Sequence, residues 1–236
     1  MNYQQVLQAR LNRKTRSSRP FANFWESFLP CDEAASAVLQ GRVAPEFQVL
    51  LERSAVISVV SAVEVYYRDI LDYLFRYCEY SFFEEKLKVL HPEKYYIHDL
   101  INIHRHQIHP LELVSSAQSF QSTERIDRVF SLFVDGGFWN SVLGQQVFFG
   151  AEPPDPMNSD KSNIATWTAE DFTGLKNIFL LRHEIVHDPA RRSIMTEEVH
   201  TWLGQAASMI FGSDLVLGRM LTANKRPEAI DEAKKI

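Results

Sequence analysis

The stretch Glu46–Tyr80, EFQVLLERSAVISVVSAVEVYYRDILDYLFRYCEY, carries the strongest helical signal in the chain. Apolar side chains recur along it three and four positions apart and leave little polar face. They are Phe47, Leu50, Leu51, Ile57, Val60, Val63, Val65, Tyr67, Ile70, Leu71, Leu74 and Phe75. A helix that is apolar nearly all round is buried nearly all round. The sequence therefore predicts one central core helix of about 35 residues, unless a break near Ser54 divides it.

Shorter helical patterns lie on both sides of this stretch. We expect further helices over residues 1–12, 83–90, 93–109, 111–134, 169–187 and 196–221. Pro92 and Pro110 mark two of the ends, because the residue before a proline is pushed out of the α region. Thr168, followed three residues later by Asp171, is typical of a helix start. With only 9 glycines and few segments that alternate with a period of two, the sequence predicts an all-α fold.

Two regions do not fit the helical pattern. Residues 138–167 show little periodicity and contain several prolines, which favours a loop-rich insertion or lid. The N-terminal region is basic, because its first charged residues are all cations: Arg10, Arg13, Lys14, Arg16 and Arg19. We therefore expect a basic arm with a short helix over residues 1–45, a helical domain over 46–222 that contains the insertion, and a charged tail over 223–236.

Composition excludes several classes of protein. Hydrophobic residues make up 45% and charged residues 23%, as in ordinary globular domains. No apolar run reaches the length of a membrane span, so we expect a cytoplasmic protein without membrane contact. Cys31 and Cys78 are too few for a disulfide framework, which fits a reducing compartment. Because the net charge is -5, any site for a polyanion must be local.

The stretch Leu181–Pro189, LRHEIVHDP, contains the His-Glu-x-x-His pattern of zinc hydrolases. His183 and His187 would share one helix face, and Glu184 would activate a bound water. The pattern lacks a third ligand at a short spacing, and Pro189 ends the helix where zinc proteases need it to continue. We therefore expect no metal and no other cofactor, and keep the zinc hydrolase as the least favoured of three alternatives.

The same stretch read from Arg182 gives Arg-x-x-x-x-His, which resembles the signature of the HEPN family (higher eukaryotes and prokaryotes nucleotide-binding). The polar His183 stands where that family often carries a polar residue, and His187 closes the motif. Upstream, Ser61–Leu71, SAVEVYYRDIL, is similar to the Ser-x-x-Glu-x-x-x-Arg stretch of the family's central helix. The resemblance implies an antiparallel HEPN-like helical bundle, a homodimer with a composite active site, and RNA cleavage in a toxin–antitoxin or antiphage setting.

A helical wheel places several side chains within a sector of about 100°: Phe172, Leu175, Phe179, Arg182, His183 and Val186. Arg182 and His183 are therefore expected on the apolar face. An arginine there needs an anion or a buried partner, and Glu64 on the central helix is a candidate. His187 lies about 140° from Arg182 on this wheel. Either the helix end reorients His187, or a dimer axis brings a second copy alongside, as the resemblance implies.

The chemistry that follows needs no metal. His187 would act as general base on a ribose 2′-hydroxyl or as general acid for the leaving 5′-oxygen. Arg182 would stabilise the charge on the phosphorane, and His183 would orient the phosphate or form a hydrogen bond across the dimer interface. The product would be a 2′,3′-cyclic phosphate, so the substrate must be RNA. Arg191 and Arg192 either hold neighbouring phosphates or belong to a solvated loop.

Two further functions stay open. The first is a non-catalytic HEPN-like domain that binds RNA, a nucleotide or a protein, and the second is the zinc hydrolase. An antitoxin protein is a further expected partner of a toxin. Toxins of this family that are silenced by adenylylation carry a tyrosine two residues after the motif histidine, where this chain has Pro189. Silencing of that kind is therefore not expected here.

Other polar and aromatic side chains have simpler explanations. Five histidines lie close together, at His91, His98, His104, His106 and His109. They lack accompanying cysteines or patterned carboxylates, so we expect solvated or RNA-facing side chains rather than a metal ligand set. Trp139 and Trp167 could stack on bases, but aromatic side chains that close the core under a long loop are the favoured interpretation.

Overall fold

The computed structural model describes residues 6–8, 19–90, 96–106, 108–148, 164–188 and 195–227. Several predicted features fall outside these residues. They include most of the helix expected over residues 1–12, the basic residues before Arg19, and Pro189, Arg191 and Arg192.

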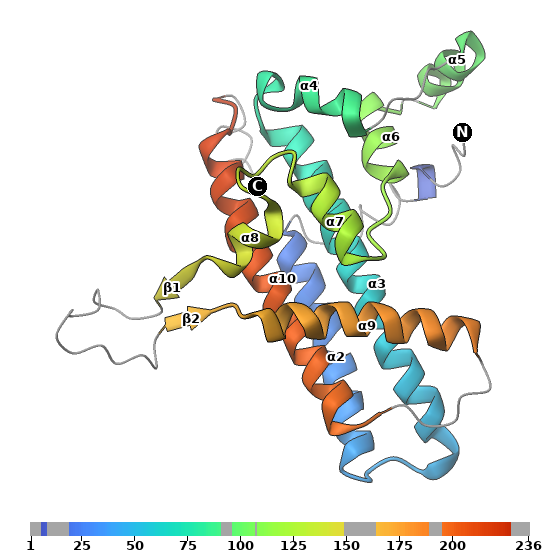
Figure 1. Ribbon diagram of the computed structural model, residues 1–236. Coiled ribbons are helices and arrows are strands. Elements are labelled where there is room, and N and C mark those ends of the chain that lie inside the picture. The colour runs from blue at the N-terminus through green and yellow to red at the C-terminus, as the bar shows by residue number, and fades with distance from the viewer. Residues whose placement is uncertain are drawn as a thin grey trace, which may run out of the picture.

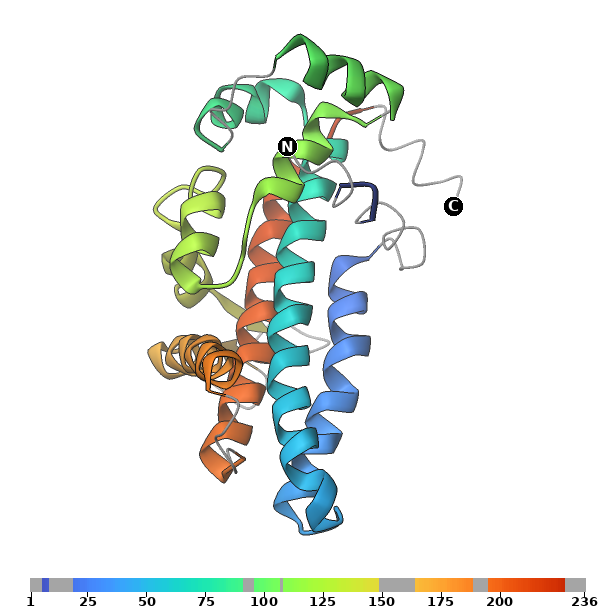
Figure 2. The same ribbon diagram turned by 90° about the vertical axis from the view of Figure 1, so that its right-hand side faces the viewer.

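The core of the molecule is a bundle of three long helices, α2 (Pro20–Leu39), α3 (Pro45–Tyr77) and α10 (Glu197–Ala223). The α3 helix runs without a break, which confirms the predicted central helix and the all-α fold. Figures 1 and 2 show α2 antiparallel to α3, whereas α10 runs in the same direction as α3. Tyr66, Tyr67 and Leu71 on α3 are among the largest fully buried side chains of this core.

The α2 helix belongs to this bundle, although the sequence grouped residues 1–45 as a basic arm with a short helix. Phe24 and Phe28 on α2 are buried, and the Phe24 ring lies 6.3 Å from the Tyr66 ring in an edge-on contact. Phe21, Phe24 and Phe28 recur at helical spacing, and this spacing was the signal for a core helix. The prediction of a basic arm rested on the cationic residues that precede α2 and not on this spacing.

Smaller helices cover the C-terminal end of α3: α4 (Tyr80–Leu90), α5 (Ile97–Arg105), α6 (Pro110–Ala117) and α7 (Thr123–Phe130). The prediction of one helix over residues 111–134 is wrong, because α6 and α7 are separate. Gln118 leaves helical geometry at a ψ of 136°, and the Ser122 side chain caps α7 by accepting a hydrogen bond from the Arg125 N–H at 3.3 Å. Phe120, in the connection, is fully buried.

The predicted insertion begins as part of the core. The helix α8 (Phe138–Leu143) and the antiparallel strands β1 (Gln146–Phe148) and β2 (Ile164–Thr166) precede α9. Trp139 is buried and donates a hydrogen bond from Nε1 to the Thr123 carbonyl at 2.9 Å. Trp167 is buried as well, so both tryptophans close the core as expected. Residues 149–163 lie outside the described part of the chain.

The helix α9 (Ala169–His187) crosses the bundle and positions the motif. The predicted helix start at Thr168 is confirmed by a capping box, in which the Asp171 N–H donates to Thr168 Oγ1 at 3.3 Å and the Thr168 N–H donates to Asp171 Oδ2 at 2.8 Å. Figure 2 shows α9 and α2 on opposite sides of the α3–α10 pair. A Cβ at Gly174 would collide with the Gln205 side chain of α10, so glycine permits the close crossing.

Polar contacts fix α10 against its neighbours. The Tyr67 and Ser213 hydroxyls lie 2.8 Å apart, and the Tyr66 hydroxyl donates to Asp214 at 3.1 Å. The Trp167 indole donates to the Ser208 carbonyl at 2.7 Å. Within the described ranges, no helix has the length and apolar character needed to cross a membrane.

Candidate functional site

Arg182 lies on the face of α9 that packs against the bundle, as the helical wheel predicts. Ile178, Phe179 and Ile185 on the same face are buried, and Arg182 itself is half-buried. Its Nε atom is buried and has no hydrogen-bond partner among the described residues. A buried guanidinium nitrogen without a partner is uncommon, because desolvation without a hydrogen bond costs free energy. The position therefore calls for an acceptor that a single chain does not provide within its described part.

His183 does not share this face, contrary to the prediction. It is exposed to solvent, and its ring centroid lies 4.3 Å from that of His187 with an interplanar angle of 56°. Residues four apart lie on the same side of a helix, whereas neighbouring residues such as Arg182 and His183 diverge by about 100°. The structure thus brings His183 together with His187 and separates both from Arg182.

His187 occupies the last turn of α9 and keeps regular helical geometry. The Asp188 N–H still donates to the Glu184 carbonyl at 2.8 Å. The helix end therefore does not turn His187 toward Arg182, and the two side chains leave the helix about 140° apart. Of the two arrangements that the sequence left open, the structure does not show a reoriented His187, and the dimer stays a prediction.

Glu64 lies on α3 and is half-buried. Among the described residues, no hydrogen bond or ion pair joins it to Arg182, so the structure does not bring the two together as predicted. Its Oε1 atom is buried without a partner, and so is the Nε atom of Arg68 one turn later. Arg68 was missed as a site residue, although it closes the Ser-x-x-Glu-x-x-x-Arg stretch. Both motif stretches thus carry buried polar atoms that lack partners in the described chain.

Apolar side chains are exposed beside the histidine pair. Leu180 and Val186 of α9 are 53% and 49% exposed. In Figure 1 the C-terminal end of α9 reaches past α3, although Ile185 in its last turns is buried. Single exposed aliphatic side chains are common on protein surfaces, so these two do not define an interface by themselves.

The histidine-rich run lies elsewhere, on α5 and at the start of α6. His98, His104 and His106 are exposed, whereas His109 caps α6 by accepting a hydrogen bond at Nδ1 from the Leu111 N–H at 3.2 Å. No group of three His, Cys, Asp or Glu side chains suited to a metal ion occurs in the described part of the chain. The His98 ring stacks on the Tyr96 ring, and its Nε2 lies 3.5 Å from Asp99 Oδ1.

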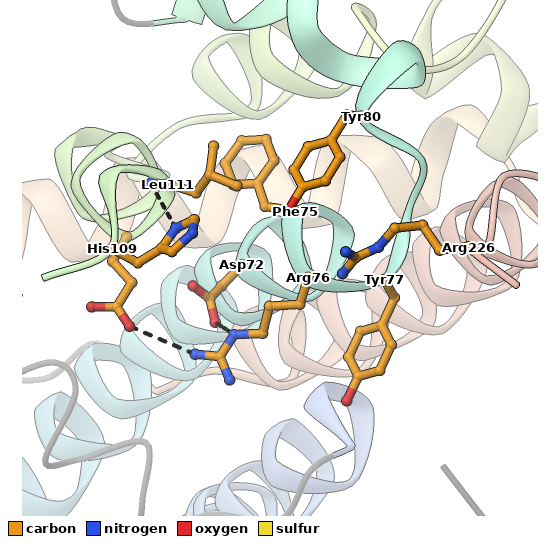
Figure 3. Close-up of a pocket in the computed structure, with 9 residues that line it drawn as sticks. Asp72, Phe75, Arg76, Tyr77, Tyr80, His109, Leu111 and Arg226 are labelled. Atoms are coloured by element: carbon orange, nitrogen blue, oxygen red, sulfur yellow. Dashed lines mark hydrogen bonds and ion pairs between the residues drawn. The ribbon is translucent and has the colours of Figure 1, made fainter. Parts of the chain in front are cut away.

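A cavity of about 430 Å³ lies at the C-terminal end of α3 (Figure 3). Arg76 in its wall pairs with Asp72 at 2.9 Å. The Arg226 guanidinium lies over the Tyr80 ring, 5.2 Å from its centroid, and the Arg226 Nε atom is buried without a hydrogen-bond partner. The remaining lining residues are Phe75, Tyr77, His109, Leu111 and Glu112. Aromatic rings beside a guanidinium suit a planar anion, and the volume lies in the range of small-molecule sites.

Comparison with known proteins agrees with the fold. The family model described as RiboL-PSP-HEPN matches residues 32–205, a range that contains all of α3 and α9. The chain belongs to this HEPN family. No curated protein and no solved structure matches the chain. The match confirms HEPN membership and supports a nuclease or nucleotide-binding role at the level of the superfamily, whereas the catalytic motif at Arg182–His187 stays a prediction.

Proposed function

We propose that this HEPN chain is a metal-independent endoribonuclease that acts as a homodimer in the cytoplasm, as a toxin or antiphage effector. The observation that carries the proposal is the placement of the Arg-x-x-x-x-His motif. Arg182 stands on the packed face of α9 with an unpartnered Nε, and His187 stands exposed in the last turn beside His183. A phosphate would satisfy the guanidinium, and an exposed imidazole can reach the sugar next to it.

The reaction follows from these groups. The imidazole of His187 accepts the proton of a ribose 2′-hydroxyl, and the 2′-oxygen attacks the neighbouring phosphorus. The 5′-oxygen leaves with a proton from a second imidazole, which gives a 2′,3′-cyclic phosphate and a 5′-hydroxyl. Arg182 stabilises the extra negative charge on the phosphorane. His183 orients the phosphate, and Arg191 and Arg192 hold neighbouring phosphates.

A second copy of the chain supplies the missing geometry. One helix cannot aim Arg182 and His187 at the same phosphorus, because they diverge by about 140°. The exposed Leu180 and Val186 give the end of α9 an apolar surface that a two-fold partner would cover. The unpartnered Glu64 and Arg68 atoms on α3 support a further partner for this region, either the second copy or an antitoxin.

Cleavage of RNA in excess EDTA tests the proposal. The purified protein should cut RNA, leave cyclic phosphate ends, and lose activity in the Arg182→Ala and His187→Ala variants. Glu184→Gln is the matched control, because Glu184 is also exposed on the last turns of α9 and has no part in this reaction. Loss of cleavage in EDTA and in Glu184→Gln would instead establish a zinc hydrolase. Binding of RNA without any cleavage would establish a binding domain.

The cavity at the end of α3 favours the alternative of a nucleotide-binding HEPN domain. The Tyr80 ring could hold a base and the Arg226 guanidinium, whose Nε atom has no partner in the described chain, could hold a phosphate. Calorimetric titration with adenosine 5′-monophosphate should show binding that Arg226→Ala removes. Arg219→Ala, at an exposed position on α10, serves as the control. Equal heats for the wild type and for Arg226→Ala would eliminate this alternative.

A further inference from the structure

His183 and His187 form a pair whose arrangement the cleavage reaction does not require. Their ring centroids lie 4.3 Å apart, and both side chains are exposed. Neither imidazole has a hydrogen-bond partner among the described residues. In that part of the chain, the two rings contact each other. Each neutral imidazole keeps one nitrogen with a free lone pair. Two such lone pairs on one side of a helix can serve a single metal ion.

We propose that His183 and His187 together bind one Zn²⁺ ion and that the bound ion inhibits the site. Imidazole nitrogen suits Zn²⁺, with bonds of about 2.0–2.1 Å. Two nitrogens at this distance from one ion require rings that lie side by side. The spacing of four residues on regular helix provides this, and α9 stays regular through His187.

The number of protein ligands distinguishes a catalytic zinc site from a site that binds zinc reversibly. A catalytic zinc ion has three protein ligands and one open position. In the described chain, no third His, Cys, Asp or Glu side chain completes such a set with the two histidines. Two protein ligands leave the remaining positions to water, so the ion exchanges with solvent. The donor set therefore fits a reversible ligand of the site rather than a permanent cofactor.

Inhibition follows from the role of His187 and rests on the proposed ribonuclease function. The lone pair that accepts the proton of the 2′-hydroxyl is the lone pair that the zinc ion would occupy. While the ion is bound, this nitrogen can neither accept nor donate a proton, so cleavage stops. The ion also carries two positive charges and holds His183 away from the phosphate that it orients.

Calorimetric titration of the metal-free, full-length protein with Zn²⁺ tests the binding. We expect one ion per chain and an affinity that falls at least about tenfold in His183→Ala and in His187→Ala, since each removes a direct ligand. His104→Ala is the matched control, because it removes an exposed histidine from α5 and should leave the affinity unchanged.

A double variant, His183→Ala with Val186→His, tests the geometry at constant histidine number. Histidines at adjacent positions do not face each other on a helix, so this protein should bind Zn²⁺ as weakly as His183→Ala. Wild-type affinity in either protein, or an equal loss in His104→Ala, would overturn the site. All of these positions are exposed, and melting curves would confirm that the variants fold.

The inhibition is tested on RNA cleavage. Zn²⁺ should reduce the rate with a half-maximal concentration equal to the calorimetric Kd, and excess EDTA should restore the rate. Undiminished cleavage with the pair saturated would overturn the inhibitory role and leave the ribonuclease function intact. If the metal-free protein cuts no RNA, the ribonuclease function fails and the inhibition with it, whereas the calorimetry still decides whether the pair binds zinc.

Discussion

Arg182 is the one charged residue of the motif that packs against the bundle. Its helical neighbours on that face, Phe179 and Ile185, are buried, and its Nε atom lacks a partner in the described chain. An apolar residue of similar length would pack better at this position, because a half-buried guanidinium loses hydration. Retaining arginine here costs stability unless an anion completes its hydrogen bonds. A phosphate does so with two parallel bonds from the planar guanidinium.

Substitution of Arg182 by lysine isolates this planar geometry. Lysine keeps the positive charge but cannot form the bidentate contact. We expect Arg182→Lys to retain the fold and to cleave RNA about 10²-fold more slowly or worse, the usual loss when one donor to a transition-state oxygen is removed. Single-turnover rates in EDTA measure this. A rate equal to that of the wild type would show that charge alone suffices and would remove the bidentate role.

Asp214 on α10 predicts how stability responds to pH. Burial raises the pKa of the Asp214 carboxyl, and the hydrogen bond donated by Tyr66 lowers it in part. Because its pKa is higher in the folded protein than in the unfolded chain, the folded protein binds this proton more tightly. The contribution of Asp214 to the free energy of unfolding therefore falls as pH rises from the ordinary aspartate pKa of about 3.9 to the raised value.

The variant Asp214→Asn should remove this fall in the free energy of unfolding with rising pH. Asparagine keeps an oxygen acceptor for the Tyr66 hydroxyl but does not ionise. We expect the variant to be at least as stable as the wild type at neutral pH, with an advantage that shrinks toward acid pH. Urea denaturation at several pH values gives the comparison. Parallel pH profiles for the two proteins would contradict the burial of this carboxylate.

At the level of elements, periodicity found the helices whose apolar face is continuous. The central helix, α9 and α10 lie within a few residues of their predicted bounds, because each presents one long apolar stripe to the core. The failures have a different cause. Residues 111–134 keep an apolar pattern across the connection between α6 and α7, since Phe120 is buried without being helical. Burial and helical conformation produce the same pattern there.

The sequence could predict only which side of α9 each residue of the candidate site occupies. The wheel placed Arg182 correctly, because its position lies in the middle of the buried face. His183 lies at the edge of the predicted sector, where burial depends on what packs against it, and nothing covers it in the described chain. A contact between Arg182 and Glu64 depends on how α3 and α9 are rotated relative to each other. The sequence pattern of a single helix does not specify that rotation.

The packing of α10 gives a paired test of close helix contact. A Cβ at Gly212 would lie 2.7 Å from Nε1 of the buried Trp167 ring, whereas nothing lies within 4 Å of a Cβ at Gly204. We expect Gly212→Ala to lower the free energy of unfolding by about 1–3 kcal/mol through overpacking. Gly204→Ala should raise it by about 0.5–1 kcal/mol, because alanine loses less backbone entropy. Chemical denaturation of both would distinguish packing from helix propensity, and equal shifts would contradict the contact.

At the scale of the whole molecule, the proposed site takes its arginine from one chain and its histidine from a second chain. The Arg182 and His187 side chains leave α9 about 140° apart around the helix axis. Two copies related by a two-fold axis would bring the arginine of one to the histidine of its partner. The family match spans α3 and α9 together, so the helix with the motif and the helix beneath it belong to the shared fold.

Mixing two inactive proteins tests the composite site. Arg182→Ala and His187→Ala copies, allowed to exchange subunits, form mixed dimers that keep one arginine and one histidine. We expect cleavage to reappear in the mixture, at a rate below that of the wild type, while each variant alone stays inactive. Size-exclusion chromatography of differently tagged copies confirms the exchange. Silence of a verified mixed dimer would contradict a site that one arginine and one histidine from different copies complete.

The crossing at Gly174 gives α9 the properties of a lever. The capping box, Gly174 and Trp167 hold the start of the helix against the bundle, and Ile185 packs the helix again within the motif. With a rise of 1.5 Å per residue, His187 lies about 20 Å along the axis from Gly174. A rotation of about 10° at that pivot would swing the imidazole by about 3.5 Å, more than the displacement of roughly 1 Å that can cost 10²-fold in rate. Substitutions at the pivot, far from any reacting atom, should therefore tune cleavage as strongly as substitutions beside the phosphate.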